Sequence, residues 1–169
     1  MGQNTKSEIV FIGDSGFPFG LAAIQRITLM AKALVLEGCK VTVVCRKGVW
    51  DKSEQQANDL YGNYEGIEYV YTSDSVFRPE SFFKRNVQKL KGLYGEFIYL
   101  RKLKKQDRIG VAILSNMSVF HALRYRLYSI LIGFPIVLNL VEMSSSIEHR
   151  AFVLTRINDY ILDKLIIKL

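Results

Sequence analysis

Residues 9–48 read IVFIGDSGFPFGLAAIQRITLMAKALVLEGCKVTVVCRKG, and this stretch decides the fold. The apolar run Ile9–Ile12 predicts a buried strand, and a loop containing Gly and Pro follows it. Leu21–Glu37 carries apolar residues at helical spacing and ends before Gly38, a residue type that is common just after a helix. Lys40–Cys45 predicts a second strand. Two strands joined through a helix in this way are expected to pair in parallel.

The rest of the chain continues this alternation of short apolar strands with helices. The polar residues 48–66 are expected to form a loop. We expect further strands over 67–71, 111–114 and 135–141, one or two helices over 81–105, and further helices over 119–132 and 147–169. Gly92 and Gly95 are expected to weaken or bend the second helix. The order β-α-β-β-α-β-α-β-α predicts an α/β fold, a Rossmann-like, doubly wound and mainly parallel sheet in a single domain over residues 1–169.

Composition limits the class of protein. The 169 residues, 49% of them hydrophobic, suffice for one domain with a substantial core. Cys39 and Cys45 flank one expected strand, which holds them too far apart for a disulfide, and free thiols suit the cytoplasm. The first ten residues do not resemble a secretory signal, and the apolar run 130–141 is shorter than the roughly 20 residues of a membrane span. Residues 160–169 are strongly apolar and lack a polar cap, which favours a natural chain that continues past Leu169.

The loop after the first strand is the leading candidate for a ligand site. It reads Gly13-Asp14-Ser15-Gly16-Phe17-Pro18-Phe19-Gly20. It opens a helix, whose N-terminal N–H groups and dipole favour an anion such as a phosphate or diphosphate. Its glycine spacing is neither that of the dinucleotide-binding motif nor that of the P-loop. A ligand-binding loop and a tight turn between strand and helix both remain open. Phe17 and Phe19 are expected to be exposed, which favours the ligand-binding loop.

The opening stretch resembles the N-terminal domain of family 4 glycosyltransferases, which have the GT-B fold. Those proteins begin with a strand, a loop of the type PYGGAA-x-R, and a helix of the type AxxLxxxGHxVTVxC that leads into the second strand. The residues that match here are Pro18-Phe19-Gly20-Leu21-Ala22-Ala23, Arg26, Ala33-Leu34, Gly38 and Val41-Thr42-Val43-Val44-Cys45. Leu21 stands where many members have a second glycine, and Cys39 stands where histidine is frequent. The resemblance covers residues 9–48.

The resemblance implies two Rossmann-like domains that face each other across a cleft. The N-terminal domain binds the acceptor, and a C-terminal domain, absent from this chain, holds the nucleotide sugar. The implied reaction is a retaining transfer of a sugar from a nucleotide-sugar donor to a glycan or lipid-linked acceptor, without a metal or other cofactor, and this fragment alone would be inactive. Gly16 and Gly20 would face the donor phosphates, Phe17 and Phe19 would shape the mouth of the acceptor site, and Arg26 would contact an anion.

Further cleft residues are expected where the strands end, because ligands of open α/β sheets bind at the carboxyl ends of the strands. Ser115 and Asn116 follow the fourth expected strand, ahead of His121, and these three are candidate acceptor contacts. Glu142 follows the fifth strand and is the candidate catalytic residue, which would orient an acceptor hydroxyl or act as a base. The alternatives are a structural histidine for His121 and a helix-capping or solvated carboxylate for Glu142. His121 and His149 lack zinc-site spacing with the two cysteines, so no metal site is expected.

The excess of positive charge lies in one segment. Residues 78–108 hold ten basic and three acidic residues, whereas the remainder holds 13 of each and is neutral. A solvated helical face is one interpretation, and attraction to an anionic membrane surface is another, because aromatic and basic residues interleave there. Nucleic acid is not expected as a partner, because no recognised binding module accompanies the charge. The expected location is the cytoplasm, with peripheral attachment to the inner face of the membrane under the second interpretation.

Two other functions remain open. A nicotinamide-dependent oxidoreductase domain would use Arg46, at the end of the second strand, to bind the 2′-phosphate of NADP, but the loop lacks the G-x-G-x-x-G spacing that such domains use. A noncatalytic membrane-binding or scaffold module would use the basic segment alone.

Overall fold

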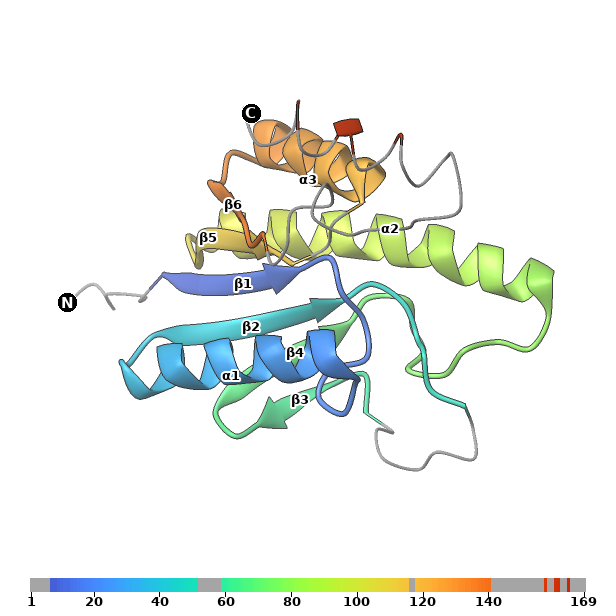
Figure 1. Ribbon diagram of the computed structural model, residues 1–169, viewed down its shortest axis with the longest axis horizontal. Coiled ribbons are helices and arrows are strands. Elements are labelled where there is room, and N and C mark those ends of the chain that lie inside the picture. The colour runs from blue at the N-terminus through green and yellow to red at the C-terminus, as the bar shows by residue number, and fades with distance from the viewer. Residues whose placement is uncertain are drawn as a thin grey trace.

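The computed structural model describes residues 7–51, 59–115, 118–140, 157, 160–161 and 164. In this part of the chain a six-stranded sheet forms the middle layer (Figure 1). Its strands are β1 (Glu8–Ile12), β2 (Lys40–Cys45), β3 (Tyr61–Tyr64), β4 (Ile67–Tyr71), β5 (Ile109–Leu114) and β6 (Ile136–Leu138). The spatial order is β3-β4-β2-β1-β5-β6, and every neighbouring pair is parallel except β3 and β4.

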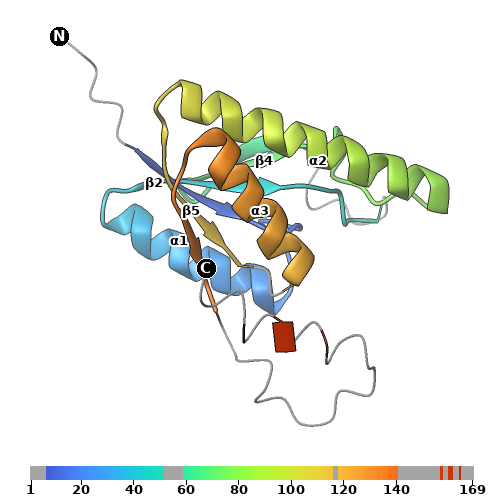
Figure 2. The ribbon, with the colours of Figure 1, turned by 90° about the horizontal axis from the view of Figure 1, so that it is seen from above.

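Helices cover both faces of the sheet (Figure 2). The helix α1 (Ala22–Leu36) lies on one face, and α2 (Phe82–Lys105) and α3 (Val119–Ile132) lie on the other. Side chains of β1 alternate between the two layers, as a strand requires. Phe11 packs in the cluster that contains Ile24 of α1, whereas Val10 and Ile12 pack in the cluster that contains Leu100 of α2 and Tyr125 of α3. The predicted Rossmann-like, mainly parallel α/β fold is confirmed.

One strand was not predicted. Residues 61–64, expected to belong to a loop, form β3 and pair antiparallel with β4 at the edge of the sheet. Glu65 and Gly66 make the tight turn between these strands, both with positive φ, and Asn63 Oδ1 accepts a hydrogen bond from the Gly66 N–H at 2.9 Å. The prediction failed because an edge strand that is largely solvated carries few apolar residues. Most of the helix expected over 147–169 lies outside the described residues.

Two glycines bring α2 onto the sheet. The helix is continuous from Phe82 to Lys105, through Gly92 and Gly95. A Cβ atom at Gly92 would clash with the carbonyl oxygen of Arg46, and one at Gly95 would clash with that of Thr72. Because Arg46 follows β2 and Thr72 follows β4, α2 lies directly against the carboxyl ends of these strands.

A charged network closes the opposite, amino-terminal end of the sheet. Glu8 is 1% exposed and accepts a hydrogen bond from Thr42 Oγ1 at 3.0 Å. Its Oε1 lies 2.9 Å from Lys40 Nζ and also pairs with Arg108. Lys40 and Arg108 each reach Glu68 as well. Four strand beginnings are thereby tied together by paired charges. Among the described helices, none has the length and apolar character needed to cross a membrane.

Candidate functional site

The carboxyl ends of β1, β2 and β5 meet where the strand order of the sheet reverses. From β1 the chain passes through α1 to β2 on one side of β1, and from β4 it passes through α2 to β5 on the other side. Ligands of open α/β sheets bind in the crevice outside such a point. The Lys47 N–H lies 3.4 Å from Ser15 Oγ, and the Ser115 N–H donates to the Ile12 carbonyl at 3.2 Å. These contacts hold the three strand ends together.

The two aromatic side chains of the loop after β1 differ in burial. Phe17 is 0% exposed and packs against Tyr64 and Tyr69, with ring centroids 6.0 and 5.9 Å away. Its carbonyl oxygen accepts a hydrogen bond from the Tyr71 hydroxyl at 2.8 Å. Phe19 is 39% exposed. The prediction that both rings are exposed is therefore wrong for Phe17, because its side chain completes the core between α1 and the sheet.

Packing within the chain accounts for the glycines of this loop. Gly16 has a φ of +110°, which favours glycine, and a Cβ atom there would lie 3.1 Å from Val49 Cγ2. At Gly20 a Cβ atom would clash with the side chain of Ile24. The space beside both glycines is thus filled by the chain's own side chains, as in a tight turn between strand and helix. Contact with donor phosphates would come from backbone N–H groups, and it stays a prediction.

Arg46 and His121 meet at this edge from different elements. Arg46 follows β2, His121 lies in the first turn of α3, and Arg46 Nη2 lies 3.4 Å from His121 Nε2. Burial, followed by the charges of Arg124 and Arg46, lowers the pKa of His121 to about 4. The ring is therefore neutral near pH 7, and because a guanidinium only donates, Nε2 is the accepting nitrogen. His121 thus orients Arg46 without adding charge to the edge.

A buried carboxylate lies behind this pair. Glu96 of α2 is 0% exposed and accepts a hydrogen bond from the Tyr125 hydroxyl of α3. Arg124 Nη2 lies 3.7 Å from Glu96 Oε2. Burial raises the pKa of Glu96, while the Tyr125 hydrogen bond and the charges of Arg124 and Arg46 act in the opposite direction. Glu96 therefore joins α2 to α3, and its charge attracts Arg46 at the carboxyl end of the sheet.

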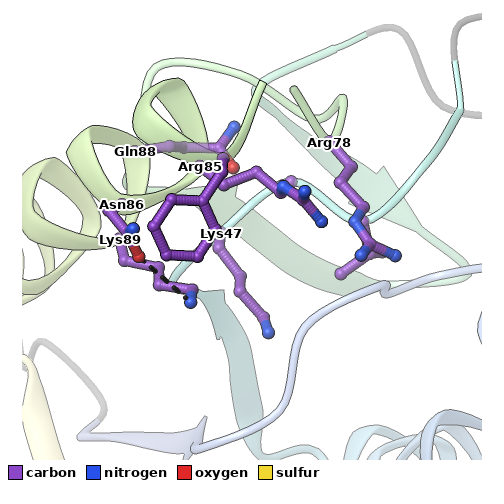
Figure 3. A pocket seen from close by; sticks show the side chains of 9 residues that line it. Lys47, Arg78, Arg85, Asn86, Gln88 and Lys89 are labelled. Atoms are coloured by element: carbon purple, nitrogen blue, oxygen red, sulfur yellow. Dashed lines mark hydrogen bonds between the residues drawn. The ribbon is translucent and has the colours of Figure 1, made fainter. Parts of the chain in front are cut away.

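A cavity of about 320 Å³ opens beside the edge, between the end of β2 and the first turns of α2 (Figure 3). Lys47, Arg78 and Arg85 point into it, and Lys89 lies at its side. None of the described residues that line it is acidic. Burial, and then the cations around it, lower the pKa of Lys47. The cavity is therefore a concentrated patch of positive charge.

The other predicted site residues lie in different places. Ser115 is buried at the end of β5, and its Oγ has no hydrogen-bond partner among the described residues. His121 comes from the helix that follows the same strand. Arg26 lies on α1, across the sheet from α3, and its buried Nε likewise has no hydrogen-bond partner in the described ranges. Asn116 and Glu142 lie outside the described residues. Contact of any of these residues with an acceptor stays a prediction.

Sequence reasoning missed the Glu96 group and the cavity. A signal existed for Glu96, because it occupies one of the apolar positions of α2, between Gly92 and Leu100, where a solvated carboxylate is not expected. No comparable signal exists for the cavity, because it depends on segment 47–50 lying beside segment 76–78.

A solved structure shares this arrangement over most of the chain. The structure of Phytolacca americana UGT2, complexed with UDP-2fluoro-glucose and pterostilbene, matches 80% of this chain and 31% of that chain, with a TM-score of 0.53 and 15% sequence identity. UGT2 is a UDP-glycosyltransferase with the GT-B fold. The two chains share a Rossmann-like fold. At 15% identity the likeness concerns the fold alone, and the resemblance to family 4 stays a prediction. No family model and no curated protein matches the chain.

Proposed function

We propose that this chain is the N-terminal, acceptor-binding domain of a retaining glycosyltransferase with the GT-B fold, similar to family 4. The enzyme transfers a sugar from a nucleotide-sugar donor to a glycan or lipid-linked acceptor. The observation that carries the proposal is the likeness of 80% of the chain to UGT2, a structure that holds UDP-2fluoro-glucose and pterostilbene. In this proposal a C-terminal domain binds most of the donor, so the chain alone is inactive.

The charge at the carboxyl edge suits such a reaction. Transfer breaks the bond between the anomeric carbon and the diphosphate, and negative charge builds on the leaving diphosphate. Arg46 and Lys47 lie at strand ends that border the crevice. Cations that are held in place in a partly buried site stabilise developing negative charge without a metal. We therefore assign Arg46 to binding the leaving diphosphate, and we assign His121 to positioning Arg46.

The remaining roles surround this edge. Backbone N–H groups at Gly16 and Gly20 face the donor phosphates, since N–H groups ahead of a helix favour an anion. Phe19, the exposed ring of the loop, borders the acceptor. Glu142 follows β6 in the sequence and orients the acceptor hydroxyl or acts as a base.

Transfer and its stereochemistry test the proposal. The protein made from the complete gene is incubated with glycan and lipid-linked acceptors and a panel of UDP-, GDP- and ADP-sugars, and released nucleoside diphosphate is measured. Proton NMR of the product then reports the anomeric configuration. Release from at least one donor with retention supports the proposal, and release from none, or inversion, contradicts it. Arg46→Gln should lower kcat/KM about tenfold, since a charged contact to the leaving group is lost, whereas Arg126→Gln, an exposed change on α3, should not.

A second role, attachment to an anionic membrane, is favoured by the outer surface of α2. Phe82, Phe83 and Tyr94 are 72–75% exposed there, and Lys84 and Arg101 are exposed on the same helix. Aromatic and basic side chains along one helix suit the interface of an anionic membrane. Co-sedimentation with phosphatidylglycerol vesicles should be salt-sensitive and independent of nucleotide sugars. A protein that stays in the supernatant at low salt contradicts this role.

A further inference from the structure

The cavity beside Lys47 has walls that backbone hydrogen bonds hold in place. Segments 47–50 and 76–78 lie side by side, joined by N–H to carbonyl bonds of 2.8 to 3.2 Å. Gln88 of α2 donates to the Phe77 carbonyl at 2.8 Å, which fastens the helix to the same segment. The cationic side chains therefore project from a fixed frame rather than from independent surface loops.

The charge inside this frame is not neutralised. Lys47 comes from the end of β2, Arg78 from the segment before α2, and Arg85 from α2 itself (Figure 3). Among the described residues none of the three pairs with a carboxylate, and the buried Nε of Arg85 has no hydrogen-bond partner there. Like charges held together without a counter-ion raise the free energy of the folded protein. A bound anion would relieve this repulsion and satisfy the guanidinium.

We propose that this cavity binds the phosphate group of a phosphorylated acceptor. Arg78 and Arg85 donate hydrogen bonds to the phosphate oxygens, because the planar guanidinium matches phosphate with two parallel bonds, and Lys47 adds a point charge. A volume of about 320 Å³ admits the phosphate and part of its carrier. Phe82 lines the cavity and is 74% exposed, so its ring is free to pack against that carrier.

The inference deepens the proposed function and rests on it, since it names the chemical class of the acceptor. A soluble phosphorylated compound and a phospholipid headgroup present the same group. The two sources differ in the group that carries the phosphate, a soluble molecule or a membrane lipid, so an experiment with vesicles distinguishes them.

Calorimetric titration of the full chain with inorganic pyrophosphate tests the site. Arg78→Gln and Arg85→Gln should each weaken binding at least about tenfold, because each removes a charge-assisted hydrogen bond. Arg85→Lys, which keeps the charge, should weaken it less. Arg126→Gln is the matched control: it removes an exposed arginine charge from α3, outside the lining of the cavity. Circular dichroism confirms that each variant is folded. Absence of binding by the wild-type chain, or equal loss in Arg85→Gln and Arg126→Gln, would overturn the inference.

Flotation with phosphatidylcholine vesicles, with and without phosphatidic acid, assigns the source. Binding that needs phosphatidic acid, is displaced by pyrophosphate and is lost in Arg85→Gln identifies a lipid headgroup. Pyrophosphate binding without vesicle binding, or with vesicle binding that Arg85→Gln leaves unchanged, identifies a soluble phosphate. Neither assay contains a sugar donor. A failure of sugar transfer would therefore contradict the proposed function without changing the result of either binding assay. If the protein transfers sugar but does not bind pyrophosphate, only the phosphate site is contradicted.

Discussion

Replacing His121 with asparagine should make the folded protein less sensitive to acid. The pKa of His121 is about 4 in the folded protein, against an ordinary value of 6.5. Between these pH values the unfolded chain binds a proton that the folded protein does not, so stability falls as the pH falls from 6.5 to 4. At about 1.36 kcal/mol for each tenfold change in proton affinity, the upper limit of this loss is about 3.4 kcal/mol. Because the ring is only half-buried, solvent screening reduces it to about 1–2 kcal/mol.

Urea unfolding near pH 7 and near pH 4 measures this loss for the wild type and for His121→Asn. Arg124 on α3, and Arg46 and Lys47 after β2, keep their charges over this range, and Glu96 on α2 is present in both proteins. The difference between the two losses therefore isolates the ring. We expect the wild type to lose about 1–2 kcal/mol more than the variant on acidification. Equal losses would mean that the ring is solvated and charged in the folded protein, which refutes its described contact with Arg46.

Four further substitutions test the packing and the buried charge of Glu8. Gly92→Ala should lower the free energy of unfolding by about 3 kcal/mol, because the new methyl group clashes with the Arg46 carbonyl; an unchanged urea midpoint would contradict the close approach of α2. Glu8→Gln should cost about 3 kcal/mol, seen as a lower Tm, because it removes the buried charge on which the amino-terminal network depends; a Tm within error of the wild type would speak against that network. Phe17→Ala should cost about 3–4 kcal/mol in thermal unfolding and Phe19→Ala less than about 1 kcal/mol, and similar losses would contradict their different burial.

The spacing of apolar residues was sufficient to predict the β1-α1-β2 unit and the helices α2 and α3. A long stretch of apolar residues at regular spacing fits one type of secondary structure only. This spacing was insufficient where the outcome depends on distant residues. Phe17 and Phe19 have the same chemistry and similar neighbours in sequence, and both rings contact Tyr64. Phe17 alone also contacts Tyr69 and belongs to the buried cluster between α1 and the sheet. The Glu96–Tyr125 hydrogen bond joins two helices 29 residues apart in sequence.

The basic segment shows the same limit, because its excess charge was visible in the sequence and its division was not. Arg108 pairs with carboxylates at the amino-terminal end of the sheet. Arg78 and Arg85 enter the cavity at the other end. Lys84 and Arg101 remain exposed on α2. A single count of charge over residues 78–108 therefore combines structural, site-forming and solvated side chains, and only the three-dimensional arrangement separates them.

The two ends of the sheet treat charge in opposite ways, and this contrast argues for a function at one of them. At the amino-terminal end, Lys40 and Arg108 each meet the carboxylates of Glu8 and Glu68, so the cations there are balanced within the fold. At the carboxyl end, Glu96 pairs with Arg124, whereas Lys47 lies among other cations without a carboxylate partner in the described part of the chain. The fold therefore pairs its cations with carboxylates at the end of the sheet where they serve only to stabilise it. Unbalanced charge that persists at the end where α/β sheets bind ligands is what an anion site requires, because a partner from within the chain would compete with the ligand.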